Sequence, residues 1–122
     1  MVRFLDARAR REGLTNLRGV RATPTDPRIP EPVDLVLVVD THHHIDDRPA
    51  YYRALRGSLR PGGRVVIIDY TLDSPEGPPA RSRLTPAQVD EELSAAGYER
   101  LGEVVPLPRQ YMLTYRVRGA AP

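Results

Sequence analysis

The feature that most constrains the fold is a nearly uninterrupted apolar run, VDLVLVVD, at residues 33–40. The run is short and rich in β-branched valine, so it predicts a strand rather than a helix. Because its apolar residues hardly alternate with polar ones, we expect both faces of this strand to be buried, as in a parallel sheet. Residues 64–70, RVVIIDY, have the same character and predict a second buried strand.

The start of the chain predicts the end of a helix. Within residues 4–16, the side chains of Phe4, Leu5 and Ala9 share one face at helical spacing. Gly13 is the residue type that commonly follows a helix end. We therefore expect an amphipathic helix before the first strand.

A second helix is expected between the two apolar strands. Asp46 or Asp47 can cap its first turn, where Pro49 is also tolerated. The triplet Pro61-Gly62-Gly63 is expected to end this helix and turn the chain. The apolar stripe that should face the sheet repeats every four residues and consists of Tyr51, Leu55 and Leu59.

A third helix is expected after a polar, proline-rich loop at residues 71–83. Thr85 and Gln88 have the spacing of a capping box, in which each side chain bonds the backbone N–H of the other residue. The helix should continue to Ala96 and stop at Gly97.

Further strand candidates lie at residues 17–22, 98–105 and 110–117, whereas four prolines exclude regular structure from residues 23–32. The last two strands are joined by a turn at residues 106–108, which is too short for a crossover helix and predicts an antiparallel hairpin. The other strands alternate with helices, so we expect an α/β fold with a mostly parallel sheet and helices on its faces.

Charge and composition narrow the classes of function. All 18 basic residues are arginines, spread along the chain, and the formal net charge is only +2. Nucleic-acid binding usually needs a clustered basic face, so we expect no nucleic-acid partner. No apolar run reaches the roughly 20 residues that span a bilayer, and no signal peptide is visible, so we expect no membrane partner and a cytoplasmic location. The absence of lysine is typical of a GC-rich, bacterial genome.

Three stretches together resemble the later part of the class I S-adenosylmethionine-dependent methyltransferase domain, of the type 11 kind. They are VDLVLVVDTHHHIDD at 33–47, LRPGGRVVIIDY at 59–70 and LTPAQVDEELSAAGYERLGEVVPLP at 84–108. The resemblance implies a Rossmann-like fold, with a partial methyltransferase domain over residues 1–118 and a tail at 119–122. It also implies an enzyme that transfers a methyl group from S-adenosylmethionine to a small-molecule acceptor.

The chain departs from this family in its first part. No glycine-rich turn occurs before residue 57, and no strand candidate precedes residue 17. We therefore expect that the first two strands of the family fold are missing, that the isolated chain is inactive, and that Met1 is an internal methionine or marks a broken gene. Residues 17–22 either leave this gap open, which makes residues 33–40 an edge strand, or move beside residues 33–40 and close the gap; we favour the second arrangement.

A sheet shortened in this way leaves apolar surface on one face. Exposed edges and apolar faces pair with other chains, so we expect a homodimer through an edge or a face of the sheet. A non-catalytic interaction module is accordingly the alternative to an enzyme.

The resemblance also implies cofactor contacts at the carboxyl ends of the strands. The family often has an acidic residue near the adenine after its third strand; Thr23 occupies that place here, and Asp26 follows three residues later. Both residues could instead simply shape a turn. Substrate contacts are expected from His43 and Tyr70, and no catalytic residue is assigned. The further cofactor contacts expected in the loop after residue 38 are Val39, Asp40, Thr41 and His44.

Two other interpretations of polar residues stay open. If the strand continued through the histidines, Asp40, His42 and His44 would share one face and could bind zinc or iron, as in a metal-dependent hydrolase. The chain has no histidine elsewhere to complete such a site, so no metal is expected. Asp69 could accept a proton from a substrate, or it could be a structural carboxylate at a strand end.

Overall fold

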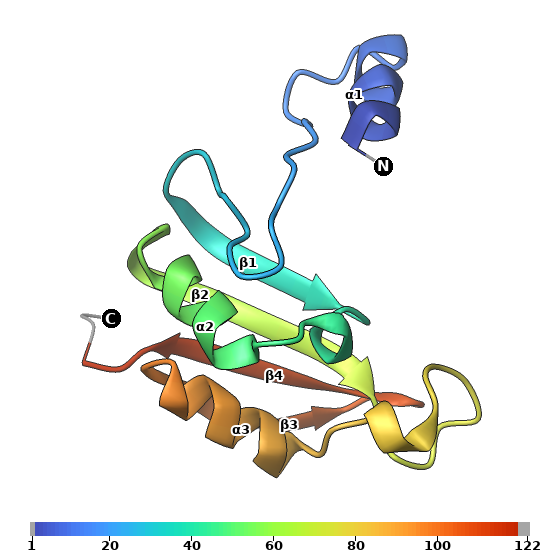
Figure 1. Cartoon of the computed structure of the whole chain (residues 1–122), viewed down its shortest axis with the longest axis vertical. Helices are drawn as coiled ribbons and strands as arrows, with labels where there is room; N and C mark the ends of the chain where they lie inside the picture. The colour runs from blue at the N-terminus through green and yellow to red at the C-terminus, as the bar shows by residue number, and fades with distance from the viewer. Residues whose placement is uncertain (1, 120–122) are drawn as a thin grey trace.

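The computed structural model describes residues 2–119, which form one mixed sheet with helices on a single face. The elements in chain order are α1 (Val2–Arg11), β1 (Val33–Val39), the 3₁₀ turn η1 (His42–His44), α2 (Arg48–Arg56), β2 (Leu59–Tyr70), the 3₁₀ turn η2 (Ala80–Ser82), α3 (Pro86–Ala95), β3 (Tyr98–Pro106) and β4 (Gln110–Val117). The order in the sheet is β1-β2-β4-β3, in which β1 and β2 are parallel and the other two pairs are antiparallel. Figure 1 shows α2 and α3 in front of this sheet.

The core lies between the sheet and these two helices. Alternate residues of β2 and β4 are buried because only every second side chain of a strand faces the helices. Three tyrosines are among its largest buried side chains, and their hydroxyls have partners: Tyr98 donates to the carbonyl of Tyr52 at 2.7 Å, and Tyr115 donates to Asp90 at 2.6 Å. The expected stripe on α2 is only partly right, since Tyr51 is half-buried and its neighbour Tyr52 is fully buried.

The expectation that β1 is buried on both faces is wrong. Val36 and Val38 pack against the core, whereas Leu35 and Leu37 are 56% and 57% exposed on the other face. The physical reason is that α2 and α3 both cover the same side of the sheet (Figure 1). The expected apolar surface on one sheet face is therefore confirmed for the described residues.

The expected strand at residues 17–22 is also wrong, as is its pairing with β1. Its polar groups are bonded elsewhere: the backbone N–H of Gly19 donates to the Asp6 carboxylate at 2.7 Å, and Arg18 forms an exposed ion pair with Glu31. A strand needs a neighbouring ladder, and this segment makes none. Within residues 2–119, β1 is thus an edge strand, and the sheet is mixed rather than mostly parallel.

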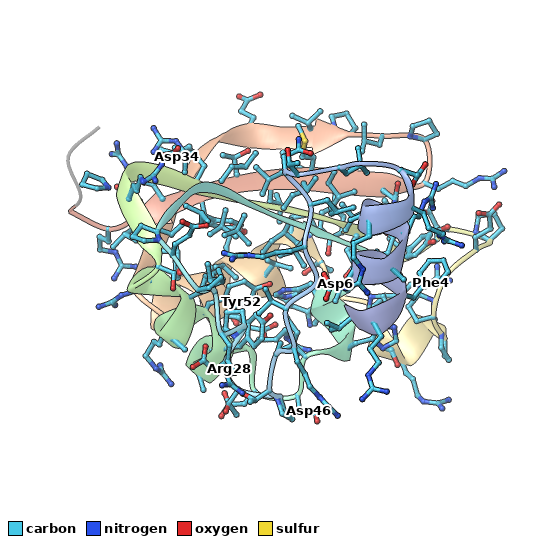
Figure 2. All side chains as sticks on the ribbon, turned by 90° about the horizontal axis from the view of Figure 1, so that it is seen from above. Phe4, Asp6, Arg28, Asp34, Asp46 and Tyr52 are labelled. Atoms are coloured by element: carbon cyan, nitrogen blue, oxygen red, sulfur yellow. The ribbon has the colours of Figure 1, made fainter. Side chains whose placement is uncertain are left out.

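The first helix is confirmed, although it contributes little to the core. Gly13 follows its end with a φ of +66°, a backbone conformation that glycine adopts at low cost. Ala9 is buried, but Phe4 is 59% exposed, so the expected apolar face is only partly covered. Figure 1 shows α1 apart from the sheet, and Figure 2 shows Phe4 on the outer side of that helix.

The expected helix signals are mostly confirmed. Asp47 caps α2 through the N–H of Ala50, and Thr85 and Gln88 make both bonds of a capping box at α3. One boundary is wrong: α2 ends at Arg56, and Pro61-Gly62-Gly63 lies inside the first part of β2. β2 begins before this triplet, at Leu59, because Leu59 pairs with Val33, the first residue of β1.

The α/β Rossmann-like class and the C-terminal antiparallel hairpin are confirmed by this arrangement. The division into a domain over residues 1–118 and a tail stays a prediction, since most of the tail lies outside the described residues. In the part of the chain that the structure describes, none of the helices is both long and apolar enough to cross a membrane.

Candidate active site

The candidate site lies where β1 and β2 end side by side. Because the two strands are parallel, their carboxyl ends meet at one edge, which is where open α/β sheets bind ligands. The turn η1 follows β1 at this edge, and the loop at residues 71–83 follows β2 (Figure 1).

The chain turns sharply as it leaves β1. Asp40 has a φ of +55°, which is uncommon for a residue with a side chain, and its N–H still donates to Ile68 of β2 at 2.8 Å. The strand does not continue through the three histidines, which instead form the single 3₁₀ turn η1. The three histidine side chains of η1 consequently have different surroundings. Among residues 2–119, no three His, Cys, Asp or Glu side chains lie close enough together to bind a metal ion. The metal-dependent hydrolase has no support here.

His43 is paired with Asp69 at the end of the adjacent strand. Its Nδ1 lies 2.9 Å from both carboxylate oxygens, and its backbone N–H donates to the same carboxylate at 3.3 Å. Both side chains are only 5% exposed. An ionised carboxylate can only accept, so Nδ1 carries the hydrogen and Nε2 is left with a free lone pair. In the neutral imidazole, Nε2 of His43 is therefore the ring atom that can accept a proton.

Asp69 is more engaged than a free base would be. It is nearly fully buried, and besides His43 it accepts the backbone N–H of Tyr70 at 2.8 Å. With both oxygens in hydrogen bonds, this carboxylate is placed to hold and orient the imidazole. The geometry therefore favours the structural alternative for Asp69.

His42 has a structural environment. Its side chain is fully buried, and Nδ1 lies 2.8 Å from the hydroxyl oxygen of Tyr52 on α2. Burial lowers the pKa of His42 to about 4, and the nearby positive charge of Arg48 contributes. The imidazole is thus neutral at pH 7 and part of the core. Figure 2 places Tyr52 inside the body of the molecule.

His44 and Tyr70 flank the His43–Asp69 pair. His44 is exposed, and its ring centroid lies 4.2 Å from that of His43. The Asp40 carboxylate raises the pKa of Tyr70, chiefly through its charge. Gln110, at the start of β4, donates to Asp40 from its side-chain amide and so fixes that carboxylate.

A cleft of about 400 Å³ lies along β1, and we call it the β1 cleft. Thr41 and Ile45, on either side of η1, line it, whereas His43 and Asp69 do not. Of the six cofactor residues expected from the sequence, Val39 and Thr41 line it. The other residues that line it are Pro27, Val36, Leu37, Val38, Ile45, Tyr51 and Leu55.

Thr23 and Asp26 lie in the turn that leads to Pro27, one wall of the β1 cleft. The Thr23 hydroxyl donates to the Asp26 carbonyl at 3.2 Å, and the Asp26 carboxylate accepts the N–H of Arg28 at 2.7 Å. These bonds hold a turn, in agreement with the structural alternative for the two residues. Burial, followed by the charge of Asp26, raises the pKa of Tyr51, which lines the cleft.

The β1 cleft fits one end of S-adenosylmethionine. Its apolar walls and open shape suit a flat adenine ring, with the Thr41 hydroxyl, already bonded to the carbonyl of Val39, at the margin. The carboxylate end of the cofactor needs a cradle of backbone N–H groups, as a glycine-rich strand-to-helix turn provides. Residues 2–119 contain no such turn between a strand and a helix.

Sequence reasoning missed two residues of the site, Gln110 and Tyr52, and one pairing. Gln110 is 70 positions from Asp40, and Tyr52 comes from another element than His42, so nothing in the pattern indicates these contacts. The pairing of His43 with Asp69 did have a signal, because both residues lie at the carboxyl end of a predicted strand.

Comparison with known proteins agrees with this fold. The family described as "Methyltransferase domain" matches residues 1–67. A phosphoethanolamine N-methyltransferase 1 of Arabidopsis thaliana is 37% identical over 67 residues, which are 54% of this chain and 12% of that protein.

Solved structures with the same fold are also methyltransferases. One is a SAM-dependent methyltransferase of Aquifex aeolicus, with a TM-score of 0.82 and 22% identity over 93% of this chain and 62% of that one. Another is the O-methyltransferase NcsB1 of neocarzinostatin biosynthesis, with a TM-score of 0.71 and 18% identity over 91% of this chain and 37% of that one. The chain belongs to the methyltransferase domain family, and it spans less than two thirds of these relatives.

Proposed function

We propose that this chain takes part in methyl transfer from S-adenosylmethionine to a small-molecule acceptor, with His43 as the proton acceptor. The observation that carries the proposal is the pairing of His43 with Asp69 at the carboxyl ends of two parallel strands, one of which, β1, lines the β1 cleft. In a member of the methyltransferase domain family, this edge of the sheet is the natural place for the reacting groups.

S-adenosylmethionine, when bound, supplies the electrophilic methyl group on its sulfonium. Where the acceptor's hydroxyl or amine must lose a proton, Nε2 of His43 would accept it. Asp69 holds the imidazole in the tautomer that keeps Nε2 free, and it stabilises the imidazolium that results. The rest of the site would contribute to the reaction mainly by positioning the acceptor in line with the methyl group, since methyl transfer is an in-line displacement.

The proposed cofactor contacts lie along the β1 cleft. Val39 and Thr41 would line the adenine, with Pro27 and Tyr51 as opposite walls. The other contacts proposed from the resemblance are Thr23, Asp26, Asp40 and His44. Tyr70 is proposed to contact the acceptor together with His43.

The relatives support a small acceptor with a hydroxyl or amine. The structure of NcsB1 holds S-adenosyl-L-homocysteine and 1,4-dihydroxy-2-naphthoic acid, and the Arabidopsis relative is named for an amine substrate, phosphoethanolamine. A hydroxyl acceptor has to lose its proton, and His43 is proposed to accept it.

A titration of the ¹⁵N-labelled chain with S-adenosylhomocysteine tests the proposal without requiring turnover. Amide shifts are expected to change at Val39, Thr41 and Tyr51 at millimolar concentration. Shifts confined to other surfaces, or none at that concentration, would contradict the placement of the cofactor. The variant Thr41→Val is expected to weaken the shifts, and Thr25→Val, in the exposed loop before Pro27, serves as its control.

Association with a second copy is a further proposal. It is supported by the unpaired edge of β1 and by the exposed leucines Leu35 and Leu37 beside it. Such association would also fit a non-catalytic interaction module. Cytoplasmic location and a bacterial source stay predictions from the sequence, and fractionation of the native host's cells would test the first.

A further inference from the structure

A second cleft, of about 310 Å³, lies between the loop at residues 71–83, the start of α3 and the turn between β3 and β4. We call it the hairpin cleft. Its walls include Leu72, Leu84, Leu107 and Tyr111. No charged residue lines it in the described part of the chain, although 28% of the sequence is charged. The lining therefore selects for an uncharged, apolar ligand.

One wall of the hairpin cleft is held in place by Arg83. Its guanidinium group donates to five backbone carbonyls of the loop, at distances of 2.5–3.1 Å. The five acceptors are Thr71, Leu72, Ser74, Glu76 and Pro78. A loop fixed in this way is a preformed surface, which reduces the entropy cost of binding a ligand.

The opposite wall is fixed by two other contacts. The Tyr111 hydroxyl donates to the carbonyl of Leu84 at 2.8 Å, so the ring of Tyr111, which is nearly fully buried, cannot rotate freely. Gln110 lines the same end of the cleft and is anchored to Asp40. Three polar residues line the cleft, Thr71, Thr85 and Gln110, and of these Gln110 contacts Asp40 of the candidate active site.

Strand register connects this cleft to the His43–Asp69 pair. Tyr111 is the register partner of Asp69, and Gln110 is the partner of Tyr70. Residues directly opposite in an antiparallel pair have Cβ atoms about 5 Å apart. One end of the hairpin cleft therefore begins about one strand spacing from the carboxylate that holds His43.

We propose that the hairpin cleft binds the apolar part of the methyl acceptor, and that the acceptor is a flat, uncharged, ring-containing molecule with one hydroxyl or amine. This assignment rests on the proposed function for the identity of the ligand as an acceptor. The volume is at the lower end of the range for ligand sites, which suits a molecule of one or two rings. The ring system contacts Leu72 and Tyr111, and the nucleophilic group lies at the end of the cleft that Gln110 lines.

The test uses 2-naphthol as the probe and the complete ¹⁵N-labelled chain. Titration is expected to shift the amide signals of Leu72, Leu107 and Tyr111 in a saturable manner. Shifts concentrated at Leu35 and Leu37 on the exposed sheet face would overturn the proposal, as would the absence of saturable binding at the solubility limit. Changes at the hairpin cleft on raising protein concentration alone would also overturn it, because a second copy would then be the occupant.

A pair of matched variants separates this cleft from the exposed sheet face. Leu72 is 52% exposed and Leu35 is 56% exposed, so both positions tolerate a polar residue without loss of the core. Leu72→Glu is expected to weaken 2-naphthol binding at least tenfold, and Leu72→Ala to weaken it less. Leu35→Glu should leave the affinity unchanged; an equal loss in both Glu variants would contradict the assignment.

The two titrations distinguish failure of this inference from failure of the proposed function. If 2-naphthol binds in the hairpin cleft and S-adenosylhomocysteine does not bind in the β1 cleft, the proposed methyl transfer is contradicted, and the hairpin cleft remains a binding site for an apolar ligand. The reverse result would leave the methyltransferase proposal intact and place the acceptor elsewhere.

Discussion

At the scale of single residues, three consecutive histidines have three different roles. A 3₁₀ helix has three residues per turn, so successive side chains point about 120° apart. In η1 this rotation directs His42 into the core, His43 to Asp69 and His44 to the surface. The chain thereby obtains a fixed imidazole with one free nitrogen from a run of identical residues.

The buried His42 should make the stability of the protein dependent on pH. Its ordinary pKa of 6.5 applies in the unfolded chain, whereas in the folded chain it is about 4. The unfolded state therefore binds the proton first, and the free energy of unfolding should fall as the pH falls from about 6.5 to about 4, by about 3 kcal/mol in total. Urea unfolding at pH 7, 5.5 and 4 measures this loss.

Two variants separate the contribution of His42 to the pH dependence of stability from the contributions of other titrating groups. His42→Gln removes the titrating group, so it should lower stability at pH 7 and flatten the dependence between pH 6.5 and 4. His44→Gln, at the exposed end of the same turn, should keep the slope of the unchanged protein. Equal slopes in all three proteins would contradict this account.

The substitution Asp69→Asn should change the hydrogen position on His43. The asparagine amide would offer an N–H₂ donor where the carboxylate now accepts, and this favours the tautomer with hydrogen on Nε2. Long-range ¹H–¹⁵N correlation spectra at pH 8 report the tautomer directly. Asp73→Asn, in the exposed loop nearby, should leave the His43 signals unchanged.

The sequence predicted part of this residue-scale picture. His43 and Tyr70 were placed at the carboxyl ends of strands because a parallel sheet brings those ends together. The division of roles among the three histidines could not be predicted, since it depends on the 3₁₀ turn and on Tyr52 from another element. A continued strand would have paired His42 with His44 instead.

At the scale of elements, short-range signals were predicted better than pairings. The caps at Asp47 and Thr85 are confirmed because each depends on residues only three positions away. The prediction of a strand at residues 17–22 is wrong because a strand needs hydrogen bonds to a neighbouring strand, and the local sequence does not show whether such a neighbour exists. The exposure of Leu35 and Leu37 could not be predicted either, because an apolar run does not show which face of the sheet the helices cover.

The loop at residues 71–83 should depend on Arg83 in particular. Lysine keeps the charge but has a single ammonium group, which cannot reach five carbonyls at once. Arg83→Lys should therefore reduce amide protection at Ser74 and Glu76 about tenfold, corresponding to about one lost charged hydrogen bond. Hydrogen exchange followed by NMR measures the protection.

The neighbouring Arg81 provides the control for this substitution. It lies in η2 with an exposed side chain, so Arg81→Lys should leave the protection of the loop unchanged. Equal effects of the two substitutions would show that general charge, rather than the carbonyl bonds of Arg83, orders the loop.

At the scale of the whole molecule, the exposed sheet face should drive association. Sedimentation across a concentration series is expected to show a reversible dimer at high micromolar concentration. Leu37→Glu places a charge in this face and should shift the equilibrium toward monomer, whereas Phe4→Glu, on the outer side of α1, should not (Figure 2). A strictly monomeric protein with a sharp cooperative melt would refute this expectation.

Cofactor affinity is also a property of the whole molecule. Each hydrogen bond to a charged group is worth about 1.5–3 kcal/mol. Without a glycine-rich cradle, the carboxylate end of the cofactor loses three or four such bonds. The binding free energy should then be weaker by on the order of 5 kcal/mol, which corresponds to more than a thousandfold lower affinity. Calorimetry should therefore find no micromolar binding of S-adenosylmethionine, and methyl transfer by the chain alone should be undetectable. A micromolar Kd would contradict this prediction.

The position of β4 has a consequence for how the chain acquires its structure. Although β4 is the last of the four described strands to be synthesised, it lies between β2 and β3 and bonds to both. Until residues 110–117 leave the ribosome, β2 lacks one neighbour, and β3 together with α3 has no sheet to join. The pairing of Tyr115 with Val65 spans 50 positions along the chain, and contacts of such long range slow folding. Completion of the core is thus a late event, and until then the exposed apolar strands are open to association with other chains.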